Sequence, residues 1–517
     1  ELWDAMRGID YLSALPFVDA RRIGAFGCSG GGTITALTGA LDPRLAAVGT
    51  ACYITSFDKL LPSIGPQDAE QSSPRFISSG LGFPDWIELA APRPYAVIAT
   101  YSDMFPFAGA RASVIEARRF YSIFDPASAG APVNGEAPSV PPTPGEPALN
   151  ADTTNHVPLT ARLQFITGPG HHGALRPIMS NILGFFMRNL EPRSDAGHPK
   201  IPPAYLQVGP QNPMEKLGKS ALQVTPTGQV ATSYPRCATV HSLNLDRAQK
   251  IVPPKRPFLT GAALAGAIRE ETGADALPGT SKFGADALET KSGTSVLTVN
   301  GFGLVGVLAV PKAAGRHPAV ILLVPDSIEG DSAIDRANKA KFQRLAAAGI
   351  VVLAFTPRPS PPGWDEMKSP ILGPDYLLSL RADLVGKTLL GLRVDDVIRA
   401  TDYLAQRRDV NPQRIGAQGS GHMGLVLMHA GVLDRRLKHI TVDHVLESYR
   451  SLLQAPMPVG APEDVIPGVL LRYDIPDLIQ VLGARLTETD ALPGTTDLSQ
   501  TSTPLETLQK PRTGNVE

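Results

Sequence analysis

Residues 27–31 read Gly-Cys-Ser-Gly-Gly and fit the pattern G-x-S-x-G, with Ser29 at its centre. A short strand is predicted over residues 22–26, directly before this turn, and a helix over residues 33–41. Small residues permit the strained turn that lifts a serine hydroxyl above the edge of a sheet. The helix dipole and the backbone N–H of Gly30 would favour an oxyanion there. Ser29 is therefore the candidate nucleophile, and Gly30 the candidate donor to an oxyanion hole.

Three other interpretations of this turn stay open. The first is a glycine-rich turn between strand and helix that carries an incidental serine. The second is a phosphate-binding loop, which is disfavoured because the lysine of a P-loop is missing. The third makes Cys28 the nucleophile, although the residue before the serine of such an elbow points elsewhere.

A serine nucleophile needs a base and an orienting acid, and in this kind of fold the acid precedes the histidine along the chain. Asp103 closely follows a strand predicted over residues 95–100 and is the candidate acid; the alternative is an aspartate that only forms a turn. A strand predicted over residues 161–167 leads into Gly-Pro-Gly-His-His-Gly. We favour His172 as the base, with His171 as the alternative base or a group on the substrate side.

No metal and no cofactor is expected. His171 and His172 are adjacent, but no other cluster of His, Asp or Glu with ligand spacing accompanies them. The three cysteines (Cys28, Cys52 and Cys237) exclude a disulfide framework, because their number is odd and their spacing wide. A formal net charge of −1 favours neither nucleic acid nor an anionic membrane as partner. The sequence also lacks an apolar run of the roughly 18 residues that span a bilayer.

The elements that position these residues occur twice in the chain of 517 residues. The stretch RGIDYL recurs as RATDYL at an offset of 392 (402 − 10), and RIGA recurs as RIGA in the same register. The matches continue without a gap until Arg93 pairs with Arg485. Both segments read helix, strand, glycine-rich turn and helix, which is the βα unit of a parallel sheet. We infer two copies of one α/β fold.

The two copies differ in completeness and in their residues. The second copy has strands upstream of its turn, predicted within residues 295–310, 319–324 and 350–355, and a helix over 337–348. The first lacks this half, so we expect that the native protein began earlier or that another chain supplies those strands. The offset maps Cys28 to Ser420, Ser29 to Gly421 and Asp103 to Thr495. The second copy is therefore expected to be inactive.

The runs GCSGGGT, APRP followed by a strand and SDMFP, and PGHHGAL resemble those of bacterial acetyl xylan esterase-like and dienelactone hydrolase-like members of the α/β-hydrolase superfamily, in a tandem version. The likeness covers roughly residues 1–190, and 290–490 as a decayed copy. It implies Ser29, Asp103 and His172 as nucleophile, acid and base. It also implies a second oxyanion N–H from upstream strands, an acetyl ester on carbohydrate as substrate, and a secreted or periplasmic location.

This resemblance divides the chain into four parts. Residues 1–194 form a catalytic domain, 195–291 a connector, 292–490 a second hydrolase-like domain and 491–517 a polar tail. The connector is rich in proline and glycine, with strand-like pieces at 221–224 and 239–245 and a helix at 261–271. Residues 127–157 are predicted to form an irregular excursion.

The function expected from these residues is hydrolysis of a carboxylic ester, of a small molecule or a carbohydrate, through an acyl-enzyme. One rival hypothesis is a serine peptidase similar to prolyl oligopeptidase, although no propeller-like repeat precedes the hydrolase half. The other is a tandem binding scaffold without activity in either copy. Cleavage of short acyl esters, cleavage of peptides, or neither would separate the three. The sequence leaves the oligomeric state open.

Overall fold

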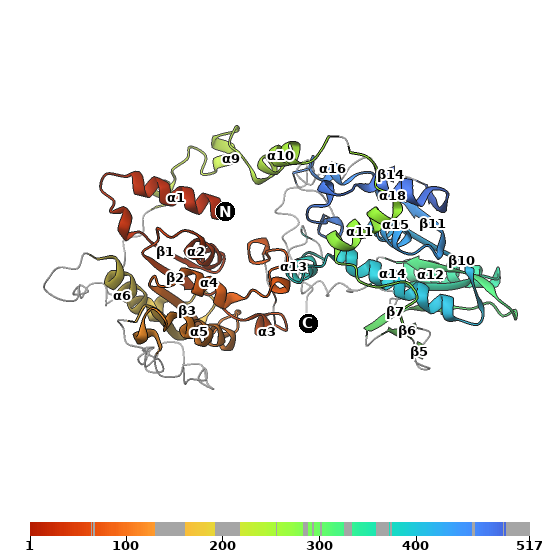
Figure 1. The fold of residues 1–517 in the computed structure, drawn as a ribbon, viewed down its shortest axis with the longest axis horizontal. Helices are drawn as coiled ribbons and strands as arrows, with labels where there is room; N and C mark the ends of the chain where they lie inside the picture. Colours follow the sequence, from red (N-terminus) through yellow and green to blue (C-terminus); the bar gives the residue numbers. More distant parts are fainter. Residues whose placement is uncertain are drawn as a thin grey trace, which may run out of the picture. The chain divides into compact units, whose positions relative to one another are not determined.

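The computed structural model describes residues 1–63, 65, 68–129, 161–191, 218–254, 256–282, 288–291, 294–299, 302–324, 333–357, 372, 375–456, 461–489 and 491–492. The chain divides into two compact units, Glu1–Ser233 and Tyr234–Glu517 (Figure 1). Among the described residues, every helix is too short or too polar to cross a bilayer.

Unit 1 alternates strands and helices along most of its length. Its elements are α1 (Leu2–Ala14), β1 (Gly24–Cys28), α2 (Gly30–Leu41), β2 (Ala47–Ala51), α3 (Phe57–Leu60), α4 (Phe83–Ala90), β3 (Tyr95–Ser102), α5 (Phe107–Tyr121), β4 (Leu163–His171), α6 (Met179–Leu190), α8 (Lys219–Leu222) and α9 (Val230–Ser233). The strand predicted from residue 22 begins only at Gly24. The preceding residues form a short 3-10 helix, Ala20–Arg22, which the Asp19 carboxylate caps.

The four strands of unit 1 form one parallel sheet in the order β1-β2-β3-β4. The order in the sheet equals the order in the chain, so each strand end lies beside the next. In parallel sheets the carboxyl ends of all strands meet at one edge. The residues that directly follow β1, β2, β3 and β4 are therefore brought to the same edge.

Both faces of this sheet are buried, as is typical of parallel sheets. On one face, Val97 and Ala99 of β3 share a core with residues of α2, α4 and α5. On the other face, Ala96 and Ile98 pack with residues of α6. Successive side chains of a strand point to opposite faces, so one apolar strand supplies both cores. The helices on both sides hold the sheet edge in place (Figure 1).

Unit 2 contains α10 (Val240–Ile251), α11 (Gly261–Thr272), β5 (Leu288–Lys291), β6 (Thr294–Val299), β7 (Phe302–Ala309), β8 (His317–Leu323), α12 (Ala333–Ala347), β9 (Val351–Phe355), α13 (Tyr376–Leu384), α14 (Leu389–Gln406), β10 (Val410–Ser420), α15 (His422–Leu433), β11 (Leu437–Asp443), β12 (Val445–Leu446), α16 (Tyr449–Leu452), α17 (Ala461–Asp464), α18 (Ile475–Leu482), β13 (Leu486–Glu488) and β14 (Ala491–Leu492). The strands predicted upstream of the second turn are confirmed as β6 to β9.

The larger sheet of unit 2 has eight strands in the order β13-β11-β10-β8-β9-β7-β6-β5. The central pairs from β13 to β9 are parallel, and the strands β7, β6 and β5 extend the sheet by antiparallel pairing. Helices α11, α14, α15 and α18 share one core with this sheet, and α12 packs on a second core that contains Leu322 and Ala354. Both units are therefore layered α/β structures. The sheet of unit 1 is parallel, whereas the larger sheet of unit 2 contains both parallel and antiparallel pairs.

Two predictions for the connector were wrong. Residues 221–224 and 239–245 were expected as strand-like pieces, but Lys219–Leu222 and Val240–Ile251 are helices. Helix α10 begins with a capping box, in which the Thr239 and Ser242 side chains each accept the other's backbone N–H. This reciprocal capping favours a helix over the strand-like form that was expected.

The helix predicted at 261–271 is confirmed as α11, but it is more than a connector element. Its residues Leu264, Ala267 and Ile268 are buried in the main core of unit 2. The boundary between the two units, at residues 233 and 234, falls within the segment assigned to the connector. From residue 130 onward, the predicted excursion lies outside the described residues, as do most of the polar tail and Thr495.

Candidate active site

Ser29 lies between the end of β1 and the start of α2 and has backbone angles φ 61° and ψ −124°. Such angles are strained for any residue other than glycine and are typical of a nucleophile elbow. Two hydrogen bonds hold the strained residue. Its N–H donates to the Ala51 carbonyl at the end of β2 (3.0 Å), and its carbonyl accepts the N–H of Thr33 (2.9 Å).

The glycines beside Ser29 are required by close approaches of the backbone. A Cβ on Gly27 would lie 2.1 Å from the carbonyl oxygen of Gly31, and one on Gly32 would lie 2.5 Å from that of Ala51. These contacts let α2 begin at Gly30, three residues earlier than predicted. The N–H groups of its first turn, including that of Gly30, therefore lie directly after Ser29.

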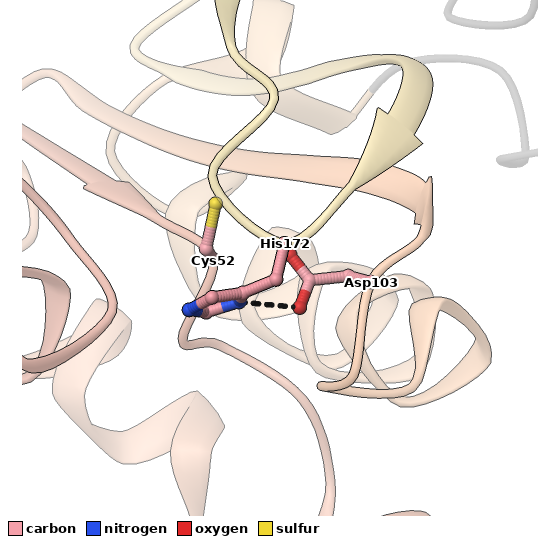
Figure 2. Close-up of side chains that lie close together, drawn as sticks. All are labelled: Cys52, Asp103 and His172. Carbon is pink, nitrogen blue, oxygen red and sulfur yellow. Dashed lines mark hydrogen bonds and ion pairs between the residues drawn. The ribbon is translucent and has the colours of Figure 1, made fainter.

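Asp103 and His172 are brought together by the register of the sheet. Ser102 of β3 pairs with His171 of β4, so the residues that follow them are neighbours. The Nδ1 atom of His172 lies 2.8 Å from Oδ1 of Asp103 (Figure 2). The Asp103 side chain is 2% exposed and that of His172 is 26% exposed. A carboxylate only accepts, so Nδ1 carries the hydrogen and Nε2 is left as the basic nitrogen.

Phe105, which the sequence analysis did not select, orients both residues of this pair. Its backbone N–H donates to Oδ1 of Asp103 (2.9 Å), and its ring lies 5.7 Å from the imidazole of His172, centroid to centroid. The hydroxyl of Thr100 lies 3.3 Å from Oδ2 of Asp103. A sequence signal was available for the first contact, because an aspartate often accepts the N–H two residues on.

The alternative base, His171, does not form the hydrogen bond to Asp103 that His172 forms. It is the last residue of β4, its side chain is exposed, and its carbonyl oxygen lies 3.1 Å from the Thr100 hydroxyl. The structure thus brings His172, and not His171, to the carboxylate of Asp103.

The side chain of Glu70 lies close to the backbone of Gly30 in the elbow. Its Oε1 lies 3.2 Å from the position that a Cβ on Gly30 would occupy. Burial raises the pKa of the Glu70 carboxyl above its usual range. Sequence reasoning missed Glu70 because nothing in its local pattern connects it with the turn.

The side chain of Cys52 also lies next to the Asp103–His172 pair (Figure 2). One ligand atom from each of Cys52, Asp103 and His172 lies within 4.8 Å of the others, and among the described residues these form a set with metal-ligand chemistry. In this arrangement Nδ1 of His172 already donates to Asp103, so a metal that took this nitrogen would displace that hydrogen bond. Sequence reasoning missed Cys52, because it lies 23 positions after Ser29 (52 − 29) in an otherwise unremarked segment.

The corresponding turn of unit 2 has the same backbone with different side chains. Gly421 has φ 55° and ψ −134°, close to the angles of Ser29, and helix α15 begins directly after it. His444 forms an ion pair with Asp443 (2.8 Å), but both side chains are well exposed. Gly421 stands at the position of the serine and carries no hydroxyl group.

The geometry of unit 1 combines a serine in a strained turn, a helix N-terminus beside it, and a histidine whose tautomer a buried carboxylate sets. Such an arrangement is suited to acyl transfer through a covalent intermediate.

The comparisons with known proteins yield short or distant likenesses. No family model matches the chain. A segment of 55 residues is 40% identical to a Bacillus subtilis (strain 168) protein named as the hydrolase YtaP. The match covers 11% of this chain and only 18% of that protein.

The similar solved structures include esterases that act on carbohydrates. A Bacteroides fragilis protein assigned as an acetyl xylan esterase has a TM-score of 0.38 and 14% identity, covering 50% of this chain and 76% of its own. A glucuronoyl esterase from Solibacter usitatus has a TM-score of 0.34 and 14% identity, with 45% and 74% covered. Acetyl Xylan Esterase 1 from Thermoanaerobacterium sp. JW/SL YS485 has a TM-score of 0.24 and 19% identity, with 39% and 63% covered.

Proposed function

We propose that this chain is a serine esterase that hydrolyses a carboxylic ester, with Ser29 as nucleophile, His172 as base and Asp103 as orienting acid. The observation that carries the proposal is the hydrogen bond between Asp103 and His172 at the same sheet edge as the strained Ser29. A paired aspartate and histidine alone occur in many proteins. Their position at the strand ends beside a nucleophile elbow favours catalysis.

In the proposed mechanism, Nε2 of His172 accepts the hydroxyl proton of Ser29 as its oxygen attacks the ester carbonyl. Asp103 keeps Nδ1 protonated and stabilises the imidazolium that forms. The N–H of Gly30, at the positive end of α2, supplies one hydrogen bond to the oxyanion. His172 then protonates the leaving alcohol, and water releases the acid from the acyl-enzyme by the same steps. The proposed reaction steps use no metal and no cofactor.

We further propose that unit 2 contains a second, inactive copy of the same fold. Helices α2 and α15, and helices α4 and α18, have the same bounds at an offset of 392 (422 − 30). Arg93 donates to the carbonyls of Gly39 and Leu45, and Arg485 donates to those of Gly431 and Leu437 at the same offset. Shared hydrogen bonds between non-adjacent elements support a common origin of the two units.

For the substrate, we propose an acetyl ester on a carbohydrate, the class that the resemblance of the sequence motifs implies. A panel of acetyl esters, longer acyl esters and peptides tests this choice. Preferential cleavage of acetylated sugar is expected. Cleavage of peptides instead would favour the peptidase hypothesis.

The experiment that tests the nucleophile is labelling of the full chain with a fluorophosphonate, followed by peptide mass spectrometry. We expect modification at Ser29, and loss of both labelling and ester hydrolysis in Ser29→Ala, by several orders of magnitude. The matched control is Ser102→Ala, which changes a serine at the same sheet edge and is expected to label normally. A folded chain that neither labels nor hydrolyses any activated ester would overturn the proposal in favour of a binding scaffold.

A further inference from the structure

Two thiols flank the elbow of Ser29. Cys28 is the last residue of β1 and directly precedes Ser29, and Cys52 directly follows β2. The parallel register places Cys28 opposite Ala51, so Cys28 and Cys52 lie on neighbouring strand ends. Cys52 is 3% exposed and has φ 54°, and its N–H donates to the Ile98 carbonyl (3.0 Å). Cys28 packs against the same core cluster as Cys52.

The proximity of the two thiols shifts their pKa values in opposite directions. The neighbouring Cys52 side chain lowers the pKa of the Cys28 thiol to about 7. The same contact, together with burial, raises the pKa of the Cys52 thiol. The thiolate is the reactive form in thiol oxidation, and a lowered pKa favours it at Cys28. Cys52 stays protonated and adjacent, in the position of a resolving thiol.

We propose that Cys28 and Cys52 form a redox-modification site, at which a hydroperoxide closes a reversible disulfide and thereby switches off the esterase. The inhibition rests on the proposed function of Ser29, whereas formation of the disulfide does not. The structure holds the two residues as free thiols, which is the active state in this proposal.

The chemistry balances with the hydroperoxide as oxidant. The Cys28 thiolate attacks the peroxide bond, the O–O bond breaks, and the product alkoxide takes up a proton to leave as an alcohol, or as water from hydrogen peroxide. Cys28 is now a sulfenic acid. The sulfur of Cys52 attacks it, the S–O bond breaks, and the hydroxide leaves as water with the proton of Cys52. Two thiols are oxidised, and one peroxide is reduced.

The disulfide affects Ser29 because its two ends lie next to the groups that position the nucleophile. Cys28 precedes Ser29, and Cys52 follows Ala51, whose carbonyl holds the N–H of Ser29. A disulfide has a sulfur separation of about 2.05 Å, much shorter than the approach of two sulfur atoms that are not bonded to each other. Drawing the two sulfur atoms together would shift the backbone at Cys28 and at Ala51–Cys52, which holds Ser29 in position. A displacement on the order of 1 Å can reduce the rate of catalysis about 100-fold.

The same contraction disturbs the base. A ligand atom of Cys52 lies within 4.8 Å of those of Asp103 and His172, and Figure 2 shows the three side chains next to one another. Moving Cys52 toward Cys28 alters the packing beside the Asp103–His172 hydrogen bond. Nucleophile and base are thus perturbed by one covalent bond.

The test treats the reduced full chain with hydrogen peroxide and maps its peptides under non-reducing conditions. We expect a cross-linked peptide that joins Cys28 to Cys52 and is lighter by two hydrogens than its reduced parts. Ester hydrolysis is expected to fall at least tenfold and to recover with dithiothreitol, but not with a chelator. Recovery with a chelator alone would point instead to a metal bound at Cys52, Asp103 and His172.

Matched variants separate this pair from general oxidation. Cys52→Ser and Cys28→Ser are each expected to lose the cross-link and the dithiothreitol-reversible inhibition, relative to their own untreated samples. Cys237→Ser, which changes the third cysteine, should respond to peroxide as the parent does. Reversible inhibition that persists in Cys52→Ser, or a parent chain whose Cys28 and Cys52 stay reduced, would overturn the proposal. Peptide mapping needs no activity, so an inactive parent that still cross-links would contradict only the esterase function.

Discussion

At the scale of single residues, the Asp103 carboxylate lies at the centre of the site. It accepts hydrogen bonds from Nδ1 of His172 and from the backbone N–H of Phe105, and its side chain is almost fully buried. A buried carboxylate that accepts several hydrogen bonds holds its partner in one orientation. Because it pairs with Nδ1, it determines which nitrogen of His172 can act as a base. The catalytic role that we propose for His172 thus depends on Asp103.

The adjacent histidines provide a matched test. His172→Ala is expected to lower kcat by about three orders of magnitude or more, because it removes the proposed base. His171→Ala should stay within a few-fold of the parent, since that side chain is exposed and His172, not His171, pairs with Asp103. Steady-state hydrolysis of an activated acetyl ester measures both. Equal losses in the two variants would contradict the assignment of the base.

At the scale of elements, the site depends on how closely α2 approaches the sheet. Helix α2 begins at Gly30 and contacts the end of β2 through Gly32, whose missing Cβ leaves room for the Ala51 carbonyl. The same carbonyl accepts the N–H of Ser29. One backbone oxygen therefore positions both the elbow and helix α2, whose N-terminus is proposed to bind the oxyanion.

Two neighbouring glycines of α2 should respond differently to alanine. Gly32→Ala would place a methyl group 2.5 Å from the Ala51 carbonyl oxygen. We expect the free energy of unfolding of unit 1 to fall by about 1–3 kcal/mol, the usual cost of overpacking.

In Gly31→Ala the new Cβ meets nothing within 4 Å. This variant is expected to be as stable as the parent, or more stable by up to about 1 kcal/mol from helix propensity. Denaturant unfolding of both variants tests the pair. A Gly32→Ala chain as stable as Gly31→Ala would mean that α2 can shift away from β2 at little cost.

At the scale of the whole molecule, the two units have separate hydrophobic cores. All members of two core clusters lie in unit 1, and all members of the two others lie in unit 2. His429 is fully buried in unit 2. Its Nδ1 donates to the Leu425 carbonyl (2.8 Å), so Nε2 accepts from the Tyr473 hydroxyl (3.2 Å). With this pairing, both ring nitrogens of the neutral imidazole have a hydrogen-bond partner.

This histidine should make unit 2 sensitive to acid. Burial lowers the pKa of His429 from 6.5 to about 4 in the folded chain. Above pH 6.5 the imidazole is neutral in both the folded and the unfolded state, and its contribution to stability is complete. Between pH 6.5 and about 4 only the unfolded chain takes up this proton, so the contribution of His429 to stability falls as the pH falls, by up to about 3 kcal/mol.

Thermal unfolding of the parent at several pH values between 7 and 4 measures this loss. His429→Gln, which keeps a donor and an acceptor but does not titrate, is expected to show a weaker pH dependence. The exposed His439 supplies the control, since His439→Gln should follow the parent. An unchanged slope in His429→Gln would show that other groups cause the acid sensitivity.

The sequence predicted β1, α2, β3 and β4 of unit 1 and the strands β6 to β9 of unit 2, because periodic apolar patterns and glycine turns are local signals. It failed for residues 239–245, which were expected to be strand-like but form the capping box and first turns of helix α10. It also missed Phe105, Glu70 and Cys52. The role of each depends on neighbours from other strands or loops, which no local pattern contains.

By itself, the sequence determined the elbow at Ser29, because the glycines that permit its strained backbone lie within a few residues of it. It also indicated Asp103 and a histidine of the pair 171–172, since both follow strands that end at one sheet edge. Only the tertiary structure decided that His172 meets Asp103 and that Cys52 lies beside Cys28. These contacts depend on the register between neighbouring strands, which the packing of the complete sheet sets.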